Sequence, residues 1–325
     1  MAVSNEELLR KAILTVGNGE GSGDFGGPDQ GALSIEQATA FIELMTAGQS
    51  ILSDVRTVSS SAAKWNESII DFAGRITRPG VEANRLDYTQ RAKPLTGLVE
   101  LDTELIRAEV PVSDETFEDN VAGEGLRATL QRLIADRVGY DVEELMVQGD
   151  TTDTDPYLAL LDGWLKIARN AGNTVDASAF DGGRDYQAIF KALIKKLPQR
   201  FLRNLQSNGR FYVPLMLEVE WRDVLAGRGT ALGDVSLTSD NVLRYQGIEI
   251  RGAGTFQPVD DTNATILLAH AANLYAGFHR SLKFETFRDP REGVTSFLAN
   301  ARVGANIGVP EATAIADGVD ISDES

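Results

Sequence analysis

The residues with the clearest chemical pattern are three aspartates in the segment GDTTDTDPY. Asp150, Asp153 and Asp155 offer carboxylates at a spacing that resembles a calcium-binding loop. Such a loop needs oxygen ligands at alternate positions, a glycine at the sixth position and a glutamate at the twelfth. Counted from Asp150, those positions hold Asp155 and Leu161. Aspartate and threonine also hydrogen-bond to nearby backbone amides, so the segment predicts a turn without a metal.

The other reactive residue types form no catalytic or cofactor-binding pattern. His270 and His279 lie outside any H-E-x-x-H motif, and their spacing suits neither one helix face nor one strand face, so we expect structural roles. The glycines at 17, 19 and 21 have no preceding strand and no following Lys-Ser or Lys-Thr, which a phosphate loop requires. Cysteine is absent, which excludes thiolate zinc sites. We predict no enzyme, no cofactor and no metal.

Composition and charge describe a large soluble chain that repels nucleic acid. The chain has 325 residues and a formal net charge of −17, whereas a protein that neutralises the DNA backbone carries the opposite sign. No apolar run is long enough to span a membrane. One local basic patch is conceivable, and its alternative is an ordinary solvated helix face. The patch would comprise Lys191, Lys195, Lys196, Arg200, Arg203 and Arg210.

A strand followed by one long helix dominates the middle of the chain, over residues 97–150. Apolar residues recur there every three to four positions, which predicts an amphipathic helix that Gly149 ends. The repeating residues are Leu126, Leu130, Leu133, Ile134, Val138, Val142 and Leu145. A second, shorter helix is predicted over 157–171.

Residues 62–110 predict a long two-stranded excursion. Trp65 and its apolar neighbours form one arm, and Val99, Leu101 and Leu105 form the other. The polar segment between the arms carries Pro79-Gly80 and has too few apolar residues to bury itself. A loop of this length is commonly functional, or becomes ordered against another molecule.

The remaining elements predict an N-terminal arm and a mixed second half. Helices over 4–16 and from 34 to 48 flank a glycine-rich linker. After residue 184 the patterns predict helices over 186–197 and 215–225, and strands over 210–213, 248–251, 264–269, 274–278, 282–287 and 294–306. The acidic segment after Pro310 is expected to be loose.

This order of parts, an α+β fold, resembles the major capsid protein of tailed bacteriophages, whose fold is shared with encapsulin shells and the herpesvirus capsid floor. The most specific segments are the strand-to-helix junction VELDTELIRAEVPVSDETFEDN through EELMVQGD, and LPQRFLRN with RFYVP. The resemblance implies an N-terminal arm (1–48), a strand into the peripheral domain (49–61), an extended loop (62–96), a peripheral domain with a spine helix (97–184), an axial domain (185–257), a return to the peripheral domain (258–309) and an acidic tail (310–325).

The resemblance also implies a structural subunit that assembles into pentamers and hexamers of an icosahedral shell around double-stranded DNA. The extended loop and arm would contact neighbouring subunits, through Arg75, Arg78, Glu82, Arg85, Arg91, Lys93 and Phe41. Assembly would also bury the spine-helix face that carries Leu126, Leu130, Leu133 and Val138. The loop tip has no lysine, although Lys64 and Lys93 flank it, so the lysine crosslink of some relatives is not expected.

Partners and location follow from the same resemblance. The shell would enclose DNA without binding it specifically, would contact no membrane, and would form in the cytoplasm of a bacterial host. Because about thirty residues precede the second helix, scaffolding would be a separate protein, beside a portal and a decoration protein. One alternative is an encapsulin-type nanocompartment with the same fold. A more distant alternative is a soluble hydrolase that uses acidic residues.

Overall fold

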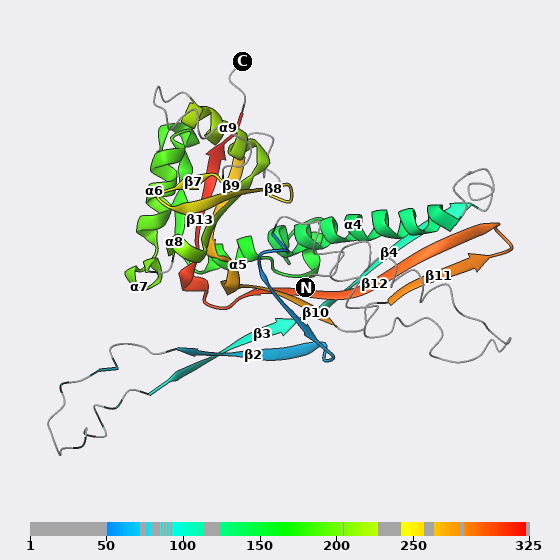
Figure 1. Cartoon of the computed structure of the whole chain (residues 1–325), viewed down its shortest axis with the longest axis horizontal. Coiled ribbons are helices and arrows are strands. Elements are labelled where there is room, and N and C mark those ends of the chain that lie inside the picture. The colour runs from blue at the N-terminus through cyan, green and yellow to red at the C-terminus, as the bar shows by residue number, and fades with distance from the viewer. Residues whose placement is uncertain are drawn as a thin grey trace.

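The subunit is elongated and is built from two sheets, a long helix and a projecting hairpin (Figure 1). The computed structural model describes residues 51–71, 93–113, 124–203, 205–226, 242–256, 263–279 and 283–322, with isolated positions between 76 and 91. The predicted helices over 4–16 and 34–48 lie outside these residues.

The strands are β1 (Arg56–Ser60), β2 (Lys64–Asp71), β3 (Leu95–Asp102), β4 (Glu104–Ser113), β5 (Thr174–Asp176), β6 (Gly209–Pro214), β7 (Arg244–Tyr245), β8 (Ile248–Ala253), β9 (Asn263–His270), β10 (Leu274–His279), β11 (Lys283–Asp289), β12 (Val294–Ile307) and β13 (Ala314–Asp320). The α-helices are α4 (Glu124–Gln148), α5 (Trp164–Asn170), α6 (Tyr186–Lys196), α7 (Gln199–Leu202), α8 (Leu205–Asn208) and α9 (Leu215–Ala226). Short 3-10 helices span Leu158–Leu160, Ala177–Ala179, Asp181–Gly183, Ala271–Asn273 and Pro310–Ala312.

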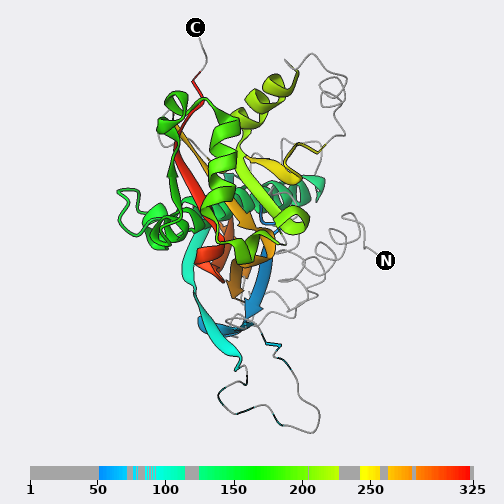
Figure 2. The same ribbon diagram turned by 90° about the vertical axis from the view of Figure 1, so that its left-hand side faces the viewer.

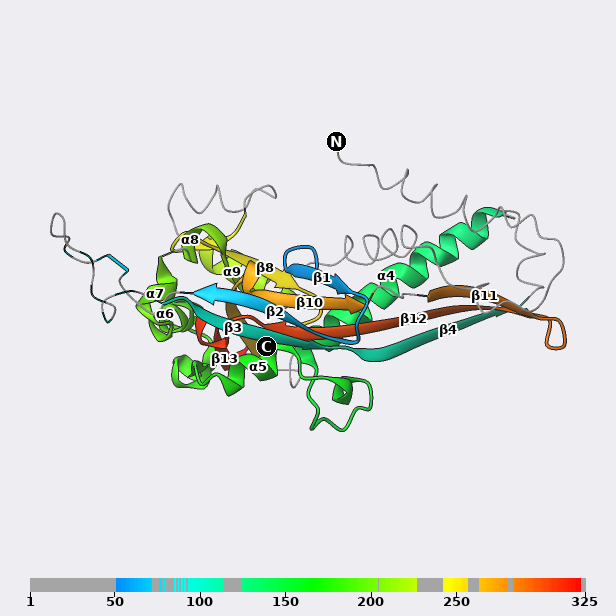
Figure 3. The ribbon, with the colours of Figure 1, turned by 90° about the horizontal axis from the view of Figure 1, so that it is seen from below.

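The first sheet, here called the peripheral sheet, is organised around the long strand β12. Strand β11 pairs with one end of β12 and β10 with the other, while β4 pairs along the opposite edge. Strand β1 joins β10 in parallel. Figure 3 shows β4 and β12 running side by side along the length of the molecule, with α4 following the same direction. The strands predicted over 274–278, 282–287 and 294–306 are confirmed. The placement of Leu105 in the second hairpin arm is wrong, because the hairpin ends at Asp102 and Leu105 lies in β4, paired with Arg302 of β12.

The long helix predicted by periodicity is confirmed as α4. Ile134, Val138, Val142 and Leu145 are buried in one core, against the inward side chains of β4 such as Ile106. This burial is what apolar residues at helical spacing predict. The helix ends before Gly149, where a Cβ would lie 2.5 Å from the carbonyl oxygen of Leu145.

The single helix predicted over 157–171 is wrong. The chain forms a 3-10 turn, Leu158–Leu160, and then α5, Trp164–Asn170. The backbone is extended at Leu161 and at Gly163, which separates the two segments. Gly163 also packs closely on the end of α4, where a Cβ would lie 2.7 Å from the backbone nitrogen of Gly149.

The second sheet, here called the axial sheet, has six strands in the order β5-β13-β9-β6-β8-β7. Helices α6 and α9 bury Phe190 and Trp221 against each other and against the sheet, with ring centroids 5.2 Å apart. Figure 2 shows α6, in green, in front of the sheet. The helices predicted over 186–197 and 215–225 are confirmed.

The axial sheet takes strands from outside the range 185–257. Strand β5 precedes that range, and β9 and β13 follow it. The prediction of a loose tail after Pro310 is wrong for β13, which lies between β5 and β9 with Ala314, Ile315 and Val319 buried. The acidic residues of the segment are paired: Asp317 with Arg169 and Asp320 with Arg184.

Candidate assembly surface

The β2–β3 hairpin projects from the body of the molecule (Figure 1). The strands pair from Lys64↔Asp102 to Asp71↔Leu95. Alternate residues of a strand point to opposite faces. Val99 and Leu101 are buried, whereas Leu98 is 63% exposed. The hairpin therefore presents a large apolar side chain that the subunit itself does not cover.

At its root the hairpin lies directly against the peripheral sheet. Gly277 of β10 pairs with Gly304 of β12. A Cβ at Gly277 would lie 3.2 Å from the ring of Trp65, and one at Gly304 would overlap the carbonyl oxygen of Asp102. Two paired glycines thus allow the hairpin to cross the sheet at backbone distance.

A hydrogen-bonded corner fixes the same root. The backbone nitrogen of Thr103 donates to the carbonyl oxygen of Ala63 at 3.1 Å, and its hydroxyl donates to the same oxygen at 2.8 Å. Asn306 donates its side-chain amide to the carbonyl oxygen of Glu100 at 2.6 Å. The hairpin is therefore anchored at its base while its strands extend outward.

Three of the predicted contact residues of the loop are among the residues that the structure describes. Arg85, Arg91 and Lys93 are described, and all three side chains are exposed. The others, Arg75, Arg78, Glu82 and, in the arm, Phe41, lie outside the described residues. The exposure of Arg85, Arg91 and Lys93 leaves these side chains accessible to a neighbouring molecule.

Lys64, at the hairpin base, forms an ion pair with Asp102. The hydrogen bond and the negative charge of Asp102 raise the pKa of Lys64 above its ordinary value. A protonated amine has no lone pair for nucleophilic attack. The Lys64 amine is therefore held by Asp102 at the base of the hairpin.

The four predicted residues of the spine helix differ in their accessibility. Leu133 is 56% exposed, whereas Val138 is buried in the core of the subunit itself. Leu126 and Leu130 lie within α4, but their side chains are outside what the structure describes. Of the two side chains described, only Leu133 is accessible to a neighbour.

Sequence reasoning missed two exposed apolar sites. Leu215, Met216 and Val219 on α9 are each about half exposed, because the opposite face of that helix carries the buried Leu217 and Trp221. Phe287 on β11 is 59% exposed. The sequence signal that could have identified the α9 site is its number of apolar residues, which is larger than one buried helix face requires.

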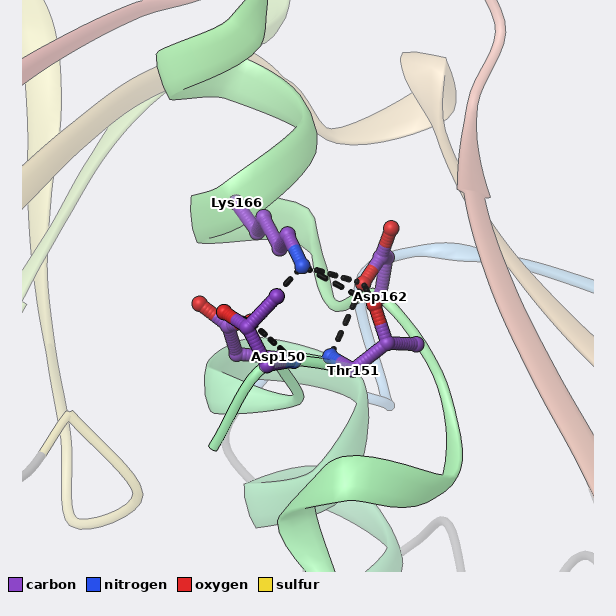
Figure 4. Close-up of polar contacts among 5 residues, drawn as sticks. Asp150, Thr151, Asp162 and Lys166 are labelled. Atoms are coloured by element: carbon purple, nitrogen blue, oxygen red, sulfur yellow. Dashed lines mark hydrogen bonds and ion pairs between the residues drawn. The ribbon is translucent and has the colours of Figure 1, made fainter. Parts of the chain in front are cut away.

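The aspartate-rich segment forms turns with its own backbone, as its composition predicts. Asp150 accepts from the backbone nitrogen of Thr152 at 2.7 Å, and Asp153 and Asp155 accept from nitrogens two residues ahead. Figure 4 shows the Lys166 ammonium between Asp150 and Asp162, at 2.7 and 2.9 Å. These hydrogen bonds from Lys166 and Thr152 lower the pKa of Asp150 to about 2. The cluster joins the end of α4 to the start of α5.

The two histidines occupy separate structural positions. Burial lowers the pKa of His270, which favours the neutral ring. The Nε2 atom of His279 lies 3.0 Å from the carbonyl oxygen of Ser61. In the part of the chain that the structure describes, no three His, Cys, Asp or Glu side chains gather as a metal site would require. No helix among those residues is both long and apolar enough to cross a membrane.

The predicted basic patch is divided. Arg210 is half-buried and forms ion pairs with Asp54 and Glu249. Arg200 pairs with Glu311. The remaining members, Lys191, Lys195, Lys196 and Arg203, are exposed. Arg210 therefore belongs to a half-buried group of ion pairs and is not part of a surface patch.

Comparison with known proteins gives one relative by sequence and several by structure. No protein-family model matches the sequence. The chain is 33% identical over 306 residues to YqbE of Bacillus subtilis (strain 168), a protein assigned as a prophage capsid protein, and the match covers 92% of this chain and 94% of that protein.

Solved structures of low sequence identity share the fold. A chain of the satellite phage P4 procapsid, which includes a size determination protein, has a TM-score of 0.67 at 14% identity, covering 98% of each chain. A Mycobacterium phage Adephagia chain has a TM-score of 0.56 at 13% identity, covering 98% of this chain and 97% of that one. A chain of the SrpI encapsulin complex of Synechococcus elongatus PCC 7942 has a TM-score of 0.51 at 12% identity, covering 83% of this chain and 87% of that one.

The hairpin, the long helix and the two sheets are thus arranged as in phage capsid subunits. The sequence match to the Bacillus protein extends over nearly the whole of both chains. The chain therefore belongs to the family of tailed-phage major capsid proteins.

Proposed function

We propose that this chain is the structural subunit of an icosahedral shell that encloses the double-stranded DNA of a tailed phage. The observation that carries the proposal is the nearly full-length match to a prophage capsid protein. The match extends over 92% of this chain and 94% of that protein, and is not a match of one shared motif.

The geometry supports self-association as the activity. The hairpin extends from the body and leaves Leu98 exposed, while Leu133, Phe287 and the α9 side chains form further uncovered apolar sites. Different surface patches on identical subunits can make head-to-tail contacts that close into rings. We assign these patches, with Arg85, Arg91 and Lys93 of the loop, to contacts within pentamers and hexamers.

The charge of the chain supports a container that does not bind its contents. At −17, the subunit repels phosphate groups, so packaged DNA would be enclosed without specific contacts. The further partners that we propose are a separate scaffolding protein, a portal and a decoration protein. Assembly would take place in the cytoplasm of the bacterial host, and the product would be the virion shell.

Electron microscopy of the purified protein tests the proposal. Wild-type protein should form closed particles, with the separate scaffolding protein present. Deletion of residues 77–91 should leave a folded subunit, judged by circular dichroism, that forms defective shells. Replacement of the same residues by a Gly-Ser linker of equal length separates the effect of side chains from that of length. A monomer that stays monomeric at high concentration would contradict the proposal.

An encapsulin-type compartment is the second candidate, because the fold likeness includes an encapsulin subunit. The two functions differ in the contents of the particle. A phage shell isolated from infected or induced cells should contain nuclease-protected DNA. An encapsulin should contain a copurified enzyme, which mass spectrometry of intact particles would identify.

A further inference from the structure

The described part of the subunit begins with a tight turn, residues 51–55, whose backbone is held by a buried side chain of α4. Asp54 and Val55 donate their backbone nitrogens to the carbonyl oxygen of Ile51, at 2.8 and 3.1 Å. Glu143 is 1% exposed, and its Oε2 atom accepts from the backbone nitrogens of Ile51 and Leu52, both at 3.0 Å. One carboxylate oxygen thus satisfies two buried amides from a segment about ninety residues away in sequence.

The second oxygen of the same carboxylate holds the end of β8. Oε1 accepts from the hydroxyl of Thr255 at 2.8 Å, and Thr255 is also buried. Two further side chains of α4 reach this segment: Tyr140 donates to the carbonyl oxygen of Gly254 at 3.0 Å, and Gln148 donates to that of Thr255. The spine helix is therefore bonded both to the turn and to the strand end.

The side chain of Asp54 connects the turn to the axial sheet. It forms ion pairs with Arg210 of β6 and Arg251 of β8, neighbouring strands of that sheet. The Asp54 side chain is 11% exposed, so the pairs are only weakly screened by solvent. Ile51 and Leu52 are buried in a core that α4 shares with the peripheral sheet and with axial-sheet residues such as Tyr212 and Leu267.

From these contacts we infer that the turn 51–55 is a joint that fixes the angle between the spine helix and the axial sheet, and that Glu143 is its positioning residue. The turn is bonded to α4 through its backbone and to β6 and β8 through Asp54. Removal of the Glu143 carboxylate releases the polar attachment of the turn to α4, while the apolar core around the turn remains.

The functional consequence rests on the proposed shell. In a closed shell of identical subunits, a small change of angle within each subunit changes the curvature of the whole. A joint that is held rigidly therefore favours one particle diameter. A loosened joint should give particles of several diameters, without loss of the subunit fold.

Substitutions at Glu143 distinguish hydrogen bonding from charge. Glu143→Ala leaves two buried backbone amides without their acceptor, and such groups are costly. Glu143→Gln can place its amide oxygen on the two nitrogens and donate its NH₂ group to the Thr255 hydroxyl, which can act as an acceptor. Glu144→Ala, at the neighbouring half-buried position of α4, is the matched control.

The experiment measures particle diameters by electron microscopy and amide hydrogen exchange of the turn in the full-length subunit. For Glu143→Ala we expect a broad distribution of diameters and a loss of protection at residues 51 and 52 of about tenfold or more, at unchanged far-UV circular dichroism. Glu143→Gln should restore both readouts, and Glu144→Ala should match the wild type.

Three results would contradict the inference that the turn 51–55 is a joint held by Glu143. One is Glu143→Ala particles of wild-type diameter with full protection of the turn. Another is equal defects in the Gln and Ala variants. If Glu143→Ala does not fold, amide hydrogen exchange of the wild-type protein tests the inference instead. The third contradicting result would be amides of residues 51 and 52 that exchange faster than those at the centre of α4. Failure of the wild-type protein to form particles would instead refute the proposed function, and exchange would still test the joint.

Discussion

At the scale of single residues, one contact in this subunit requires a residue without a side chain, and another requires a positively charged side chain. The root of the hairpin needs the absence of a side chain, because Gly277 and Gly304 face Trp65 and the Asp102 carbonyl group. The junction of α4 with α5 needs a cation, because Lys166 lies between two carboxylates. Each demand gives a prediction for the isolated subunit.

Gly304→Ala should destabilise the subunit. The new methyl group would overlap the Asp102 carbonyl oxygen, and overpacking typically costs about 1–3 kcal/mol. This exceeds the gain of about 0.4–1 kcal/mol from a less flexible unfolded chain. Urea unfolding measures the difference. Gly254→Ala is the control, because its nearest neighbour, a Leu215 methyl carbon, would lie at 3.6 Å. Equal stability of the two variants would refute the close approach.

Lys166→Met should reduce the stability of the subunit at neutral pH and weaken its dependence on acid. The pKa of Asp150 is lowered to about 2 in the folded state, against about 4 in an unfolded chain. A lowered carboxylate pKa stabilises the folded state above about pH 4, and this contribution is lost as the pH falls towards about 2. Comparison of wild type and variant by thermal unfolding across this range isolates the effect. Lys191→Met, at an exposed position on α6, should leave the profile unchanged.

At the scale of elements, α4 carries a buried and an exposed apolar side chain at adjacent positions. Ile134 is buried against the strands of the peripheral sheet, whereas Leu133 is 56% exposed. One face of the helix holds the subunit together, and the other is available to a neighbour. Because the two residues are consecutive, substitutions there separate folding from assembly with little difference in position.

Leu133→Asp should leave the isolated subunit within about 0.5 kcal/mol of wild-type stability, as expected for an exposed position. Ile134→Ala should cost about 2–5 kcal/mol, because it empties part of the core. Urea unfolding at low concentration measures stability, and sedimentation measures assembly. The expected result for Leu133→Asp is normal folding with impaired assembly. Normal shells from that variant would remove Leu133 from the proposed interface.

At the scale of the whole molecule, net charge opposes the association that the apolar patches favour. Every copy carries a formal charge of −17. Electrostatic repulsion between copies extends over about 30 Å at 0.01 M ionic strength and about 3 Å at 1 M. The salt concentration therefore determines how much of the repulsion subunits meet when they approach.

Assembly of the purified subunit should be faster and more complete when sodium chloride is raised from about 0.01 M to about 0.5 M, because screening removes the long-range repulsion. Light scattering over time measures the rate, and sedimentation measures the yield. Potassium chloride at equal ionic strength is the control for a specific ion effect. Slower assembly in high salt would show that attractive ion pairs between subunits outweigh the net charge.

Local patterns in the sequence were sufficient for most elements of this subunit. The apolar spacing of Ile134, Val138, Val142 and Leu145 predicted α4, and alternation predicted both arms of the hairpin. The prediction of one helix over 157–171 missed the extended backbone at Leu161 and Gly163, which apolar spacing does not reveal. Leu133, one of the contact residues predicted from the sequence, is exposed in the structure. The exposed apolar face of α9 was not predicted.

The sequence by itself determined most of the helices and strands, because hydrophobic periodicity acts over a few neighbouring residues. The tertiary structure decided which distant segments meet. It placed β13 between β5 and β9, although acidic residues made that segment resemble a tail. It also brought Glu143 to the amides of residues 51 and 52. Such pairings depend on burial of groups far apart in the chain, and no local pattern encodes them.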